Sequence, residues 1–145
     1  MATAQTVYES GGSLGGEIPA SGVPHQYASV VELAPYLLMP GIRARAVHGE
    51  RVTVSIVDLD AGLSMPEHHH ANEQVGTVLR GEITFTIGGE TRVRRTGDMW
   101  VIPSGVPHLV TVGPEGCTVV EVFSPPRDDW AALERGPAGR GDWPI

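Results

Sequence analysis

The sequence predicts an all-β fold built as a single domain. Short apolar segments recur along the chain and are bounded by glycine or proline, of which the 145 residues contain 19 and 12. No helical periodicity is present before residue 127. Many short strands separated by turn residues are typical of a β-sandwich or a closed barrel. A chain of this length is also large enough to bury one hydrophobic core.

Composition divides the chain into three regions. A flexible N-terminal arm rich in Gly, Ser and Pro spans residues 1–26, the strands occupy residues 27–126, and a short helix with a tail spans residues 127–145. We expect one strand of the arm to dock on a neighbouring molecule. The helix is expected over 127–135, because its first turn contains two aspartates, which the positive end of a helix dipole favours.

The expected strands follow the apolar segments in order. They cover residues 29–33, 36–39, 42–48, 52–59, 75–79, 82–87, 91–95, 100–102, 108–112 and 118–123, with a histidine-bearing strand after Pro66. Gly49-Glu50 and Gly88-Gly89 each separate two of these segments and therefore predict β-hairpins. Over 52–56, valine and isoleucine alternate with threonine and serine, so one face of this strand points inward and the other outward.

Composition also argues against several partners and locations. The net charge of −7 and the pI near 5.2 argue against nucleic acid and anionic membranes as partners. The first residues lack the basic start and apolar run of a signal peptide, and the apolar stretch containing Pro35 and Pro40 is too short to span a bilayer. The single cysteine, Cys117, cannot form an internal disulfide. We therefore expect a cytoplasmic protein.

Two segments carry residues suited to metal binding, GLSMPEHHHANEQVGTVLRG and GDMWVIPSGVPHLV. Neutral imidazole is the commonest protein ligand for mid-series divalent ions. Because side chains alternate along a strand, His68 and His70 point to one face while His69 points to the other. Two ligands are too few for a selective site, and His108 in the second segment is the expected third ligand.

The spacing of these residues resembles the two signature motifs of the cupin superfamily. The matching positions are Gly62, His68, His70, Gln74 and Gly81 in the first motif and Gly97, Pro103, Gly105 and His108 in the second. The resemblance implies a double-stranded β-helix, or jelly-roll barrel, that binds one divalent metal through His68, His70, Gln74 and His108. The usual motif has a carboxylate where Gln74 stands, so His48 and His69 are alternatives for the fourth ligand. Cupins are often dimers, which implies a homodimer.

The phrase HHHANEQVGTVLRGE, with the Gly-rich arm and the short tail, also resembles the cupin-type cyclases of bacterial aromatic polyketide pathways. This resemblance implies ring closure of a poly-β-ketone by aldol condensation and loss of water. The substrate is then a hydrophobic polyketide, free or bound to a carrier protein. Zinc is the expected metal, with iron, nickel and manganese as alternatives. No general base follows from a motif, and His48, Glu67 and Tyr36 are the candidates.

Neutral ligands leave a divalent ion its full charge, which suits Lewis-acid chemistry. We expect an apolar barrel lining that fits a flat hydrophobic substrate. The expected lining residues are Val54, Ile56, Val78, Phe85, Trp100, Ile102, Val110 and Val122. Three other functions are open: an iron- or nickel-dependent dioxygenase, a cupin that acts on unsaturated uronates, and a metal-stabilised ligand-binding module. Oxygen consumption during turnover separates the dioxygenase from the cyclase.

Overall fold

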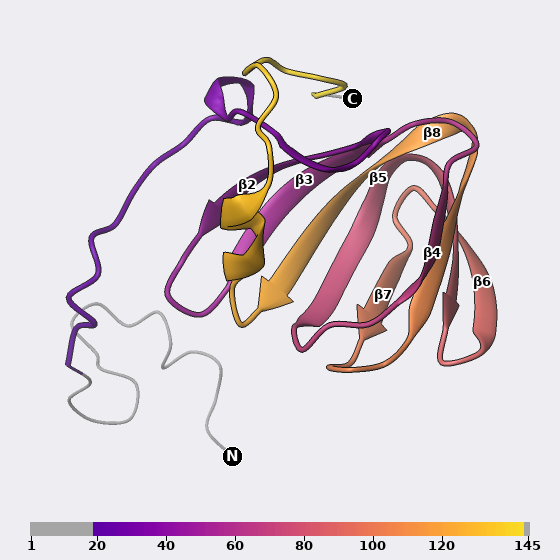
Figure 1. Ribbon diagram of the computed structural model, residues 1–145, viewed down its shortest axis with the longest axis horizontal. Helices are drawn as coiled ribbons and strands as arrows, with labels where there is room; N and C mark the ends of the chain where they lie inside the picture. The colour runs from indigo at the N-terminus through magenta and orange to yellow at the C-terminus, as the bar shows by residue number, and fades with distance from the viewer. Residues whose placement is uncertain (1–18, 144–145) are drawn as a thin grey trace, which may run out of the picture.

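The computed structural model describes residues 19–143, which form an antiparallel β-barrel with two short 3-10 helices (Figure 1). The strands are β1 (Tyr36–Met39), β2 (Ile42–His48), β3 (Thr53–Leu59), β4 (Ser64–His68), β5 (Glu73–Ile87), β6 (Glu90–Arg95), β7 (Met99–Ile102) and β8 (His108–Ser124). The 3-10 helices are η2 (Val30–Glu32) and η3 (Asp128–Ala132). Among these residues no helix has the length and apolar composition of a membrane span.

Two long strands, β5 and β8, pair with each other and belong to both layers of the barrel. The first half of β5 pairs with β7 and its second half with β6. The first half of β8 pairs with β4 and its second half with β3. One layer therefore runs β1-β2-β3-β8-β5-β7 and the other β4-β8-β5-β6. The predicted all-β jelly-roll barrel is confirmed, as are the two hairpins at Gly49-Glu50 and Gly88-Gly89.

The passage of β5 from one layer to the other depends on a glycine. The register between β5 and β8 shifts on both sides of Gly81, which has a φ of 82°. A Cβ atom at this position would collide with the backbone of Gly116 on β8. Only glycine combines this backbone conformation with so close an approach of two strands. The matching glycine of the first motif therefore has a structural role in the barrel.

Two local predictions are corrected by the structure. The expected strand at 29–33 is wrong: these residues form η2, whose backbone bonds are local (Glu32 N donates to Ser29 O), because no strand lies beside them. The expected helix at 127–135 is reduced to the five-residue η3. It stops because Trp130 is buried in the core and the chain then pairs with β1, where Leu37 N donates to Glu134 O. The predicted arm lies largely outside the described residues, and its part from residue 19 has no regular structure.

The two faces of β3 are the reverse of those expected. Thr53 and Ser55 are buried, whereas Val54 is 38% exposed on the outside of the barrel. The inward polar groups are satisfied, because Thr53 Oγ1 accepts a hydrogen bond from Arg127 N and Ser55 Oγ donates one to Glu121 O. Buried hydroxyl groups with partners cost little, so the alternation fixes the period of the strand but not which face is internal.

The outside of the larger layer contains a buried ion pair that the C-terminal tail covers. Arg45 and Asp58 are 5% and 1% exposed, and Arg45 Nη1 lies 3.1 Å from Asp58 Oδ2. Thr118 Oγ1 donates to the other carboxylate oxygen of Asp58. The tail completes the cluster, because Gly139 O accepts from Arg45 Nε and Asp142 N donates to Asp58 Oδ2. Each buried charge thus has several partners, as buried ions require.

The substitution Arg45→Met should lower the free energy of unfolding by about 3–5 kcal/mol, because it leaves the Asp58 carboxylate buried without its cation. The matched control is Arg43→Met on the same strand, which removes an exposed ion pair to Asp60 and should cost at most about 1 kcal/mol. Denaturant unfolding of both variants measures the difference. Equal losses for the two variants would show that the tail does not seal this pair from water.

Candidate functional site

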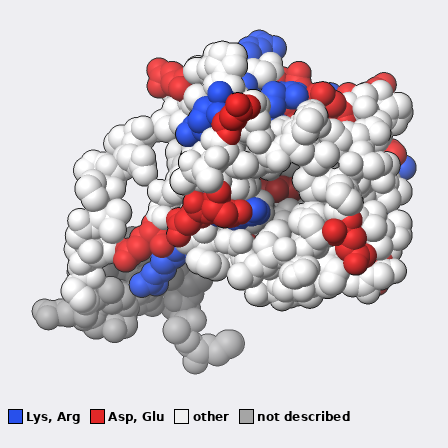
Figure 2. Space-filling model, in the orientation of Figure 1, with Lys and Arg blue, Asp and Glu red and all other residues white. Residues whose placement is uncertain are grey.

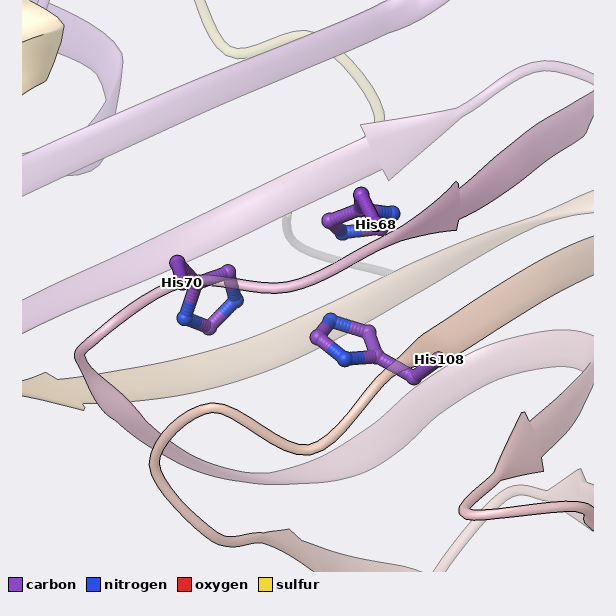
Figure 3. A group of neighbouring side chains, drawn as sticks. All are labelled: His68, His70 and His108. Carbon is purple, nitrogen blue, oxygen red and sulfur yellow. The ribbon is translucent and has the colours of Figure 1, made fainter.

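Three of the predicted histidines converge inside the barrel (Figure 3). His68 ends β4, His108 begins β8 and is its neighbour in register, and His70 follows in the loop that leads to β5. Their ring centroids are separated by 4.2 Å, 5.0 Å and 6.0 Å. One nitrogen from each ring lies within 4.8 Å of the other two. Segments separated by forty residues are therefore brought to one point by the pairing of β4 with β8.

The hydrogen bonds of the three rings leave one nitrogen of each free for a metal. Every Nδ1 lies 2.8–2.9 Å from a backbone carbonyl two residues away, so Nδ1 carries the proton and donates it. The carbonyls are those of Pro66, Asn72 and Val106. Each Nε2 then has a free lone pair, and that of His108 is buried without a partner. An orphaned buried acceptor among two others fits a bound cation.

Gln74, the predicted fourth ligand, lies beside the histidine cluster. It is buried on β5, and its Oε1 lies 3.0 Å from Nε2 of His70. Because His70 is protonated on Nδ1, the lone pair of its Nε2 faces the lone pairs of Gln74 Oε1. A cation beside both atoms would remove the repulsion between these two acceptors. Burial lowers the pKa of His70 and of His108, so both rings are neutral near pH 7, the form that binds metal. The site fits a divalent ion held by three imidazoles and one amide oxygen.

The two alternative fourth ligands lie apart from the cluster. His69 is exposed, and the cluster of ring nitrogens is formed by His68, His70 and His108 without it. Both ring nitrogens of His48 are engaged, Nε2 with the Tyr36 hydroxyl at 3.0 Å and Nδ1 with Thr53 Oγ1 at 2.7 Å. Burial lowers the pKa of His48 as well. Neither residue belongs to the cluster formed by His68, His70 and His108.

None of the three predicted general-base candidates lines the cavity. His48 and Tyr36 pack against Trp130, with ring centroids 6.5 Å and 5.5 Å away, and Trp130 forms part of the cavity wall instead. Glu67 is exposed on β4. The sequence could not show this, because Tyr36 and His48 approach each other only when β1 pairs with β2.

A cavity of about 340 Å³ opens beside the histidines and Gln74. Figure 2 shows the molecule hollowed here, with an acidic side chain on the floor of the hollow. The apolar walls are Leu38, Met39, Ile42, Val57, Leu59, Met65, Ile83, Val110, Phe123, Trp130 and Leu133. The predicted apolar character is thus present, although Val110 alone among the eight expected lining residues takes part within the described chain. Val54, Ile56 and Val122 lie on the outer face instead.

Three charged residues that the sequence did not single out as cavity residues line the cavity: Glu121, Arg127 and Asp129. Glu121 enters it from β8, and burial raises the pKa of its carboxyl to about 7, although a hydrogen bond from Gln74 and the charge of Arg127 oppose the shift. Arg127 lies over the rings of Phe123 and Trp130 at 4.8 Å and 4.9 Å and pairs with Asp129. The available signal was a single charged residue, Glu121, in the otherwise apolar run TVVEVF.

The comparisons with known proteins agree with this geometry. The sequence profile of the cupin domain matches residues 55–123. An uncharacterised protein of Streptomyces coelicolor is 35% identical over 75 residues, which are 52% of this chain and 71% of that protein. The chain belongs to the cupin superfamily. The predicted family is thereby confirmed, and the histidine cluster occupies the matched region.

A further curated relative and two solved structures are also similar to this chain. The pectin degradation protein KdgF of Dickeya dadantii is 31% identical over 68 residues, which cover 47% of this chain and 62% of that protein. The solved structure of KdgF from a Halomonas species superposes with a TM-score of 0.68 at 27% identity, covering 73% of this chain and 98% of the other. An RmlC-like cupin from Shewanella frigidimarina shares the fold, with a TM-score of 0.68 and 22% identity over 74% and 96% of the two chains.

Protein purified without chelator should contain about one equivalent of a divalent metal per chain, measured by inductively coupled plasma mass spectrometry. His108→Ala should lower the affinity roughly 100-fold or more, because the four donors then become three and the one removed is the buried Nε2 that has no other partner. The control is His69→Ala, which removes the neighbouring outward ring and should leave the metal content unchanged. Full metal content in a His68→Ala, His108→Ala double variant would refute the assignment.

The raised pKa of Glu121 predicts a pH dependence of stability in metal-free protein. Because the folded state holds this proton up to about pH 7, whereas the ordinary pKa is 4.5, folding binds a proton within this window. Stability should therefore fall as the pH rises from 4.5 to 7, by on the order of 2 kcal/mol. Glu121→Gln removes the titrating group, and the difference between the two proteins in denaturant unfolding isolates the effect. If the free energies of unfolding of wild type and Glu121→Gln change with pH in parallel, the assignment of the raised pKa to Glu121 is wrong.

Proposed function

We propose that this protein is a metal-dependent cyclase that closes a ring of a poly-β-ketone by intramolecular aldol condensation and dehydration. The observation that carries the proposal is a wholly neutral donor set, three imidazoles and an amide, at one side of an apolar cavity. A divalent ion bound there, which we propose to be zinc, would stabilise negative charge as it grows on a substrate oxygen.

The walls of the cavity bind and fold the substrate. Met39, Met65 and Leu133 are flexible or branched apolar side chains that fit a hydrophobic chain, whether free or tethered to a carrier protein. Trp130 and Phe123 offer flat surfaces at the end nearest His70. Such walls exclude water and hold the attacking carbon near a ketone carbon of the same molecule, which turns the reaction into a well-oriented unimolecular step.

Glu121 is suited to the proton transfers of this reaction. Its carboxylate would accept a proton from the carbon between two carbonyl groups, and that carbon then forms a bond to a ketone carbon of the same chain. The ketone oxygen gains a proton and becomes a hydroxyl group, which leaves with one further substrate hydrogen as water. A carboxyl group whose pKa is near 7 exchanges protons in both directions at neutral pH, as such a sequence requires.

A second candidate is favoured by one observation, the guanidinium of Arg127 at the cavity. The Arg127 guanidinium lies over two aromatic rings at the cavity and could bind the carboxylate of a small sugar acid in place of Asp129. The relatives named for pectin degradation suggest an unsaturated uronate as that sugar acid. Arg127→Met should raise the KM for such a substrate, whereas the KM for an uncharged polyketide should not change.

The cyclase is tested with a poly-β-ketone made in situ by a minimal synthase and supplied to zinc-loaded protein under nitrogen. A ring pattern that differs from the spontaneous products, formed without oxygen, is expected. Glu121→Gln should slow its formation by about 10²–10⁴-fold, the usual contribution of a positioned acid-base group. Glu73→Gln, an exposed glutamate on the adjoining strand, is the control and should have the wild-type rate. Turnover that requires oxygen and iron would reject the cyclase in favour of a dioxygenase.

A further inference from the structure

The barrel contains a second pocket that is separate from the cavity beside the histidines. Strands β6 and β7 belong to different layers, and each of them pairs with β5 and with no other described strand. Both lie at the end of the barrel away from β2 and η3 (Figure 1). A pocket of about 360 Å³ opens between them, and residues of β5, β6 and β7 line it. None of these residues lines the histidine cavity.

Two packed aromatic rings separate the second pocket from the histidine cavity. The ring centroids of Phe85 on β5 and Trp100 on β7 are 4.6 Å apart. Phe85 lies beside Val110 in register, and Val110 lines the histidine cavity while Phe85 lines the second pocket. The Trp100 ring lies against Gly76, where a Cβ atom would collide with it. The aromatic pair therefore divides the interior of the barrel into two cavities.

The wall that β6 contributes to the second pocket is charged. Glu90, Arg92 and Arg94 alternate along this strand, and all three line the pocket. Arg92 Nε lies 2.7 Å from Glu90 Oε1. Arg94 forms no ion pair within residues 19–143, and its Nε donates to Val93 O. Two guanidinium groups and one carboxylate give the pocket one net positive charge, in a chain whose overall net charge is −7. This local charge favours an anion.

The aromatic wall of the pocket contains a hydrogen-bond donor without an acceptor. Trp100 is 7% exposed, and its Nε1 is buried with no hydrogen-bond partner in the described part of the chain. Buried polar atoms in proteins nearly always have a partner, because an unpaired donor loses its bond to water and gains nothing in exchange. An oxygen atom of a ligand in this pocket would supply the acceptor that Trp100 lacks.

We propose that the second pocket binds a small monocarboxylate with an apolar or aromatic body, at a site distinct from the metal. One carboxylate carries one negative charge, which equals the net positive charge of the pocket. Its two oxygens match the N–H groups of the Arg94 guanidinium. A phosphate group would bring close to two negative charges, and the second would lack a cation because Arg92 is already paired with Glu90.

The uncharged part of the pocket fits the apolar body of such a ligand. Phe85 is buried and Ile87 half-buried, whereas Met99 and Val101 are 70% and 60% exposed. Apolar side chains therefore line both the enclosed and the solvent-exposed parts of the pocket. The volume falls within the range of about 300–1,000 Å³ that is usual for small-molecule sites, which combine apolar walls with a few polar groups.

The test uses 2-naphthoate as the probe and the ¹⁵N-labelled full chain. The Trp100 indole N–H resonance reports on the second pocket, and that of Trp130, which lines the metal cavity, reports on the other site. Trp100→Phe and Trp130→Phe identify the two resonances. 2-Naphthoate should shift the Trp100 resonance saturably, with a dissociation constant below about 1 mM. 2-Naphthalenemethanol, which has the same rings without the charge, should bind at least about 10-fold more weakly.

Arg94→Met should weaken the binding of 2-naphthoate at least about 10-fold, because it removes the cation that pairs with the carboxylate. Arg95→Met is the matched control, since Arg95 is the next residue of β6 and pairs with Glu82 outside the pocket. This control should bind as wild type does. Met99→Glu keeps the test decisive if Arg94→Met fails to fold. Met99 is exposed, and a glutamate there should weaken binding at least about 10-fold by repelling the carboxylate.

The proposal is overturned if 10 mM 2-naphthoate leaves the Trp100 resonance in place or shifts the Trp130 resonance alone. Equal binding of the neutral alcohol also overturns it, as does equal affinity of the folded Arg94→Met or Met99→Glu variant and the Arg95→Met control. The two cavities share no residue, so the outcome of this experiment does not bear on the proposed cyclase. The cyclase experiment likewise does not bear on the second pocket.

Discussion

The pairing of β5 with β8 is the constraint on which the rest of the structure depends. Both strands run through the two layers, so their register fixes where the layers meet and which side chains face the interior. β8 places His108 at its start and Glu121 and Phe123 near its end in the cavity, and β5 contributes Gln74. A single ladder of backbone hydrogen bonds therefore sets both the donor atoms and the opposite wall of the cavity, and Gly81 allows the two strands to stay close at the bend.

The donor set is coupled to the carboxyl group of the cavity through Gln74. Its side chain faces the His70 ring and also hydrogen-bonds Glu121, which opposes the effect of burial on that carboxyl. An amide in this position keeps the metal ligands neutral without placing a second negative charge beside Glu121. A carboxylate there would place a like charge beside Glu121, the group proposed to transfer protons. The departure of this chain from the usual cupin motif thus leaves Glu121 without a second carboxylate beside it.

Spacing along the sequence was enough to predict the barrel and the three histidines, because each motif position has a distinct physical task. His68 and His70 share a face through the strand period, and His108 follows a Pro-x-Gly turn that returns the chain to β4. The sequence could not show which face of β3 is internal, because hydroxyl groups at Thr53 and Ser55 are acceptable inside once they have partners. It also could not reveal Glu121 as a cavity residue, since that required knowing that odd-numbered positions point inward in the second half of β8, whereas even-numbered positions do so in its first half. The residues at 127–135 have helical character, but burial of Trp130 and pairing with β1 decide their conformation.

The alternation along the second half of β8 has a consequence for how this chain tolerates insertions and deletions. Residues that point into the cavity and residues on the outer surface follow one another singly, from Val120 to Phe123. An insertion of one codon there would exchange the two sets, placing Val122 in the cavity and the Glu121 carboxylate among the outer valines. An insertion of two codons would preserve the faces and shift only the register. Over evolution, changes of length should therefore collect in the loops between strands, while β8 changes by substitution alone.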